Sequence, residues 1–77
     1  MIELDMIRIW KEGVNSFVVA DYNTIKGMKT AIGRLESVSN DGDIIIRHIH
    51  NGLIFWSLNI NSVENFKFSP MRNGGEQ

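Results

Sequence analysis

The chain contains no cysteine, only one proline and no long hydrophobic run. Without cysteine it can form neither a disulfide nor a thiolate zinc site, so we expect a reducing, cytoplasmic compartment. Glu3, Asp5 and Arg8 interrupt the N-terminal region before a signal-peptide core of about seven apolar residues could form, and no stretch approaches the roughly 20 residues of a membrane span. We therefore expect a soluble protein without a membrane partner.

Neither sign of charge prevails in the sequence. Eight basic and nine acidic residues give a net charge of −1, so the bulk charge does not indicate binding to nucleic acid or to an anionic membrane. With 77 residues the chain has room for one small core. We predict a single domain over residues 1–70 and a disordered tail over residues 71–77, which contain two glycines and almost nothing apolar.

The residues that are abundant favour β-structure. Eleven Ile and five Val stand against four Leu and two Ala, and β-branched side chains pack well on pleated surfaces. Phe17–Ala20 reads as a first strand, Asn59–Ser62 as a tight turn, and Val63, Phe66 and Phe68 mark a short last strand. The sequence predicts an all-β fold, or a mainly β fold with a short N-terminal helix.

Two segments fit more than one structure. Residues 1–10 suit a helix with an apolar stripe of Ile2, Met6, Ile9 and Trp10, or a strand, and both readings stay open. Residues 24–39 also have apolar residues at helical spacing, but two glycines inside them disfavour a helix. We predict a strand over residues 31–38, bent at its glycine, that leads through the turn residues 39–42 into a strand at 44–49.

Asn51-Gly52 is the strongest local signal for a hairpin. This dipeptide is typical of a two-residue type I′ turn. A two-residue loop predicts His50–Leu53, His48–Phe55 and Ile46–Ser57 pairs on one face, and Ile49–Ile54, Arg47–Trp56 and Ile45–Leu58 pairs on the other. Both faces of this hairpin would then carry apolar side chains, as in a barrel strand or a subunit contact.

Five short strands with a bent second strand describe a small barrel, and residues 16–70 resemble the Sm-like proteins, including the bacterial Hfq and YolD-like groups. The matching stretches are Gly33–Val38 and Asn61–Pro70. The resemblance implies a five-stranded Sm-like or SH3-like barrel that forms a homo-oligomeric ring by pairing its fourth and fifth strands, with single-stranded RNA at the pore or rim. Where Hfq has a Lys-His pair before its last strand, this chain has Asn59, Ile60 and Asn61, and asparagine amides can contact a base edge.

A locally basic stretch with neighbouring aromatic residues suggests where RNA would bind. Lysine and arginine would contact phosphate while Phe55 or Trp56 stacks on a base. The simpler reading places both rings in the core or a subunit contact. The candidate RNA-binding residues are Lys29, Arg34, Arg47, His48, Phe55, Trp56, Asn59 and Asn61.

Other classes of function have less support. His48 and His50 could share a metal on one face of a strand, but a third ligand is missing, so we predict no metal and no cofactor. The sequence has neither a nucleophile elbow nor a phosphate-binding glycine motif, so we predict a non-enzymatic binding protein in a regulatory role. The alternative is a phage-type or mobile-element regulator that binds a host protein by strand addition or through an exposed apolar face.

Overall fold

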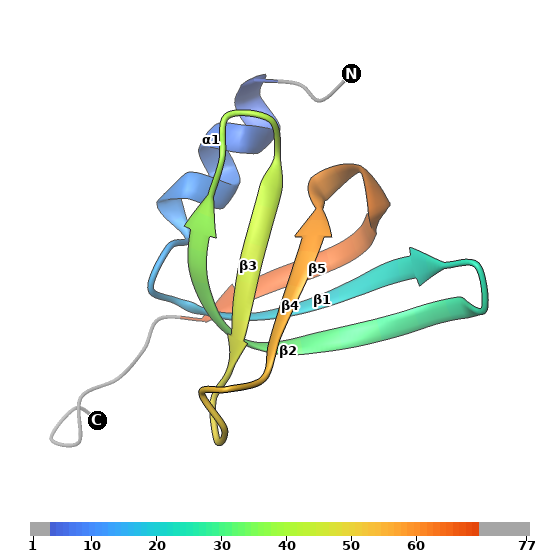
Figure 1. Cartoon of the computed structure of the whole chain (residues 1–77). Helices are drawn as coiled ribbons and strands as arrows, with labels where there is room; N and C mark the ends of the chain where they lie inside the picture. The colour runs from blue at the N-terminus through green and yellow to red at the C-terminus, as the bar shows by residue number, and fades with distance from the viewer. Residues whose placement is uncertain (1–3, 70–77) are drawn as a thin grey trace, which may run out of the picture.

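The computed structural model describes residues 4–69, which form one helix followed by five strands (Figure 1). The elements are α1 (Leu4–Glu12), β1 (Phe17–Thr24), β2 (Gly27–Val38), β3 (Asp43–His48), β4 (Phe55–Asn59), the 3₁₀ turn η1 (Ile60–Ser62) and β5 (Val63–Ser69). The predicted mainly β fold with a short N-terminal helix is confirmed. The predicted tail over residues 71–77 lies outside the described residues.

All five strands form one antiparallel sheet in the order β4-β3-β2-β1-β5. The sheet is strongly curved, so that β3 and β4 cross in front of β1 and β5 (Figure 1). Within residues 4–69 no pairing joins β4 to β5, and these two strands are the edges of the sheet. The sheet is therefore open, and the predicted closed barrel is not confirmed.

The N-terminal segment that sequence left ambiguous is the helix α1. Trp10 is fully buried and Ile7 nearly so, whereas Ile9 is 44% exposed. The predicted apolar stripe was therefore wrong at Ile9, because the helix turns Ile7 toward the sheet instead. The Trp10 ring packs 4.6 Å from Phe66 and 5.1 Å from Phe68, measured between centroids. Through these aromatic contacts α1 packs against β5.

Most of residues 24–39, which the sequence allowed to be either a helix or a strand, lie in the long strand β2. The predicted strand over residues 31–38 is confirmed. Its second half pairs with β3 and its first half with β1. At Gly33, β2 and β3 come so close that an added Cβ would lie 2.2 Å from the carbonyl oxygen of Arg47. A glycine is needed at this crossing because any side chain would collide with the backbone of β3.

The inner face of the curved sheet encloses the core. Alternate residues of β1, β2 and β3 are fully buried there, as period-2 alternation requires. The buried apolar residues are Ile7, Trp10, Val18, Ala20, Ala31, Leu35, Ile44, Ile46 and Ile60. The predicted 39–42 turn and the tight turn at η1 close the other end, and Gly42 has a φ of 86°. We call the opposite side of the sheet the outer face.

The β3–β4 connection differs from the predicted two-residue turn. Arg47 pairs with Phe55 and Ile46 with Trp56, so the predicted register is wrong by one residue. Positive φ angles in the described chain occur at Asn15, Gly27 and Gly42, not at Gly52, so a type I′ turn does not form. Instead, Nδ1 of His48 accepts hydrogen bonds from the backbone N–H groups of His50 and Asn51, both at 3.1 Å. These bonds stabilise a longer loop, and Ile46 and Trp56 both face inward.

Candidate nucleic-acid interface

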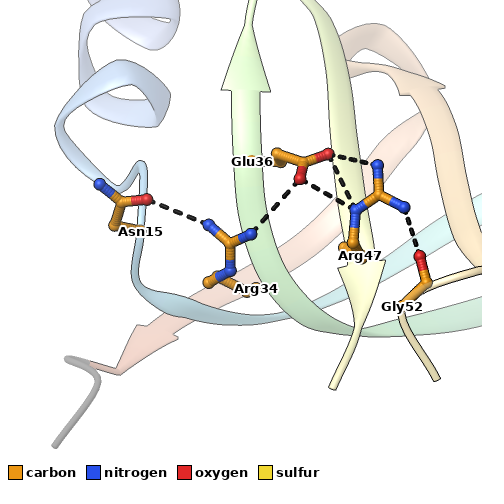
Figure 2. A network of polar contacts seen from close by, with 5 residues as sticks. All are labelled: Asn15, Arg34, Glu36, Arg47 and Gly52. Carbon is orange, nitrogen blue, oxygen red and sulfur yellow. Dashed lines mark hydrogen bonds and ion pairs between the residues drawn. The ribbon is translucent and has the colours of Figure 1, made fainter. Parts of the chain in front are cut away.

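A chain of polar contacts crosses the outer face of the sheet (Figure 2). Arg34 and Arg47 lie directly opposite each other on β2 and β3. Both guanidinium groups bind the carboxylate of Glu36, with Arg47 Nη2 at 2.7 Å and Arg34 Nη2 at 3.3 Å. At one end of this chain of contacts Arg34 donates to Asn15 Oδ1, and at the other end Arg47 donates to the carbonyl oxygen of Gly52. Two positive charges and one negative charge leave this cluster with a net charge of +1.

Aromatic rings flank the same cluster. The Arg47 guanidinium carbon lies 5.4 Å from the centroid of the Phe55 ring, at cation–π distance. Phe17 pairs with Arg34 on the other side. Phe55, Arg47, Arg34 and Phe17 thus form one row across four strands of the outer face.

Hydrogen bonds from Arg47 lower the pKa of the Glu36 carboxyl group, and the charges of Arg47 and Arg34 add to this effect. Glu36 therefore remains a carboxylate down to a lower pH in the folded protein than in the unfolded chain. A lowered folded pKa stabilises the fold above the unfolded value, and this contribution disappears as the pH falls through the folded pKa.

We predict that Glu36→Gln makes the protein less sensitive to acid. The wild type should lose more of its unfolding free energy than the variant between pH 7 and pH 3, and urea denaturation at the two pH values measures the difference. Glu12→Gln removes an exposed carboxylate on α1 and serves as the control. Equal acid losses in the wild type and Glu36→Gln would show that the ion pairs do not stabilise the fold.

A second group of rings lies at the end of β3 and comprises His48, His50 and Trp56. The rings of His48 and Trp56 stack with their centroids 6.0 Å apart and their planes at 25°. The ring of His50 lies 5.8 Å from that of His48. Trp56 is half-buried and packs against the core, so it serves both the fold and the surface.

Two adjoining hollows bring these groups together. The smaller hollow, about 210 Å³, is lined by Phe17, Arg34, Arg47, His48 and Ile49. The larger, about 360 Å³, is lined by Thr30, Ile32, His48, Ile49, His50 and Trp56. The two hollows share His48 and Ile49, so a cationic surface and an aromatic surface meet along one boundary.

The structure separates the predicted site residues into several groups. Arg34, Arg47 and Phe55 lie together on the outer face, and His48 stacks with Trp56. The prediction that Arg47 lies beside Trp56 was wrong, because the one-residue change in register places Phe55 opposite Arg47.

The remaining predicted residues lie away from both hollows. Lys29 pairs with Tyr22 on the opposite face of β2 from Arg34. The amide of Asn59 donates to Asp41 O and Asp43 Oδ1, and its Oδ1 accepts the N–H of Asn61. Asn59 therefore stabilises the start of η1, at the other end of β4. Asn61 is exposed beside it.

Sequence reasoning missed the residues that organise this surface. Glu36 stands two residues after Arg34 on a predicted strand, and this spacing could have indicated an ion pair on one face. Asn15 and Ile32 gave no comparable signal. Asn15 is placed beside Arg34 by the hydrogen bond from its backbone N–H to the carbonyl oxygen of Leu35, and Ile32 is placed by the pairing of β1 and β2.

Nothing in residues 4–69 brings three His, Asp or Glu side chains close enough to hold a metal ion. None of the helical structure that is described is long and apolar enough to cross a membrane. Comparison of the chain with family models, curated proteins and solved structures found no match.

Proposed function

We propose that the protein is a non-enzymatic module that binds single-stranded RNA at the two adjoining hollows. The observation that supports this proposal most is their shared boundary at His48 and Ile49. A nucleotide joins a planar base to a negatively charged phosphate. The larger hollow offers rings and aliphatic walls for the base, and the smaller offers guanidinium groups for the phosphate.

The distribution of charge supports the same proposal. The chain as a whole carries a net charge of −1, whereas the Arg34–Glu36–Arg47 cluster carries +1. Within residues 4–69, no Lys, Arg, Asp or Glu side chain lines the larger hollow. An anionic group is therefore attracted to one hollow, while a neutral base can enter the other without leaving a buried charge unpaired.

Self-association would strengthen this weak site. One cationic cluster gives few phosphate contacts per chain, but several linked copies would bind one RNA strand with a high effective concentration. Edge strands β4 and β5 expose unpaired backbone groups, which can pair with another copy. We therefore propose a homo-oligomer formed through these edges, as the Sm-like resemblance implies.

We expect a fluorescently labelled oligouridine to bind the full chain at 50 mM salt and to bind less tightly at 200 mM. Single-stranded binding weakens with a logarithmic slope of about 0.7 per phosphate contact, so one contact loses roughly 3-fold and two contacts roughly 7-fold in this range. Fluorescence anisotropy measures both affinities. A series of the labelled oligouridine without protein controls for effects of salt on the dye, and no binding at 50 mM would contradict the proposal.

A protein-binding regulator is the second candidate, and a specific observation favours it. Many large apolar side chains are exposed near the β1–β2 and β3–β4 hairpins, where a partner could cover them. They are Val19, Ile25, Met28, Ile32, Ile49, Leu53, Ile54 and Phe55. Binding to such a surface depends little on salt, so a complex with a protein partner that is equally tight at 50 and 200 mM would favour this candidate over RNA.

A further inference from the structure

The two arginines of the outer face are not equivalent. They occupy directly opposed positions on neighbouring strands, an arrangement in which like charges repel. One arginine would be enough to pair with Glu36. The second contributes the surplus positive charge of the cluster, so the question is which guanidinium is free to bind a ligand.

Arg47 is held at all three of its nitrogen atoms. Nε donates to both carboxylate oxygens of Glu36, at 3.1 and 2.9 Å, and Nη2 donates to Oε1 at 2.7 Å. Nη1 donates to the carbonyl oxygen of Gly52. The ring of Phe55 lies against the guanidinium as well. This paired, double-donor geometry is the strongest that an arginine forms with a carboxylate, so Arg47 is committed to the fold.

Arg34 is positioned but less fully used. Nη1 donates to Asn15 Oδ1 at 3.1 Å and Nη2 to Glu36 Oε2 at 3.3 Å. Its Nε has no hydrogen-bond partner among residues 4–69. Because a guanidinium carries five N–H groups, Arg34 retains donors for a ligand while its side chain is already ordered. About a third of the side chain is exposed, and it lines the smaller hollow.

We propose that Arg34, and not Arg47, is the phosphate-binding residue of this surface. The Nε–H and the remaining Nη hydrogens of Arg34 donate to phosphate oxygens in the smaller hollow, while Asn15 and Glu36 hold the guanidinium in place. The inference rests on the proposed RNA function for the source of the phosphate. The same chemistry also fits a free phosphate ion.

Nuclear magnetic resonance of the arginine Nε–H groups tests the assignment in the full chain. We expect inorganic phosphate to move the Arg34 signal saturably and to leave that of Arg47 in place. Arg34→Gln should weaken phosphate binding at least tenfold. Lys26→Gln removes the same charge from an exposed position on the β1–β2 turn and should bind phosphate like the wild type. Movement of the Arg47 signal alone, or of neither signal, would overturn the proposal.

A parallel titration with an oligouridine that has no terminal phosphate separates this inference from the proposed function. If it moves the Arg34 signal, the phosphodiester backbone is a ligand and both claims are supported. If inorganic phosphate moves the signal, and the oligouridine neither moves it nor binds by anisotropy, the anion site stands and the RNA function fails. If the oligouridine binds by anisotropy while the Arg34 signal stays in place, the RNA function stands and the assignment to Arg34 is overturned.

Discussion

Gly33→Ala is expected to lower the unfolding free energy by about 3 kcal/mol, a large share of the roughly 5 to 15 kcal/mol that stabilises a typical domain. The added Cβ would lie 2.2 Å from the carbonyl oxygen of Arg47 and 2.8 Å from its carbonyl carbon. Because these are backbone atoms, no side-chain rotation can relieve the collision. The strands β2 and β3 would have to separate where the sheet bends, and urea denaturation followed by circular dichroism measures the loss.

Gly52→Ala provides the matched control for this change. A Cβ at Gly52 meets no atom within 4 Å, and its φ is not positive. The control should therefore unfold at nearly the wild-type urea concentration. A Gly33→Ala protein as stable as the Gly52→Ala protein would mean that the close crossing of β2 and β3 is not required.

Trp56→Ala is expected to weaken the binding of single-stranded RNA by 5- to 150-fold, which corresponds to the loss of about 1 to 3 kcal/mol from one stacked base. The indole lines the larger hollow and stacks with His48. Since the same ring is half-buried against the core, the variant will also be less stable. Anisotropy titration of the folded variant measures the affinity, and Trp56→Phe should restore most of it because it retains an aromatic face.

Leu58→Ala separates the loss of a base contact from the loss of stability. Leu58 is on the same strand, β4, and also packs against the core, but it lines neither hollow. This variant should lose stability and keep its affinity for RNA. If Leu58→Ala weakens RNA binding as strongly as Trp56→Ala, the effect is structural and the larger hollow is not the base site.

Local composition predicted the strands of this fold more successfully than their arrangement. Local backbone preferences can be read from the sequence alone. They are set here by the runs of β-branched residues, by the glycines within residues 24–39 and by the turn residues at 39–42. For that reason the strand at 31–38 could be predicted from sequence. The N-terminal segment could not, because its helix is selected by the burial of Ile7 and Trp10 against a sheet formed later in the chain.

The register of the β3–β4 hairpin shows why the site was only partly predicted. Asn51-Gly52 favours a two-residue turn locally, but His48 Nδ1 stabilises a longer loop, and the core requires Ile46 and Trp56 on the same face. A change of one residue in register exchanges the faces of every side chain on one strand relative to the other. The sequence therefore named cationic and aromatic residues that lie near one another, but the pairing it predicted between Arg47 and Trp56 was wrong.

The most direct test of the proposed RNA site is the response of the two indole N–H signals when an oligouridine is added to the wild-type chain. Trp56 lines the larger hollow, whereas Trp10 of α1 is fully buried against β5 and serves as an internal reference. A base bound in the hollow is predicted to move the Trp56 signal saturably and to leave that of Trp10 unchanged. A Trp56 signal that stays in place at 50 mM salt while the oligouridine is in excess would contradict the proposed site.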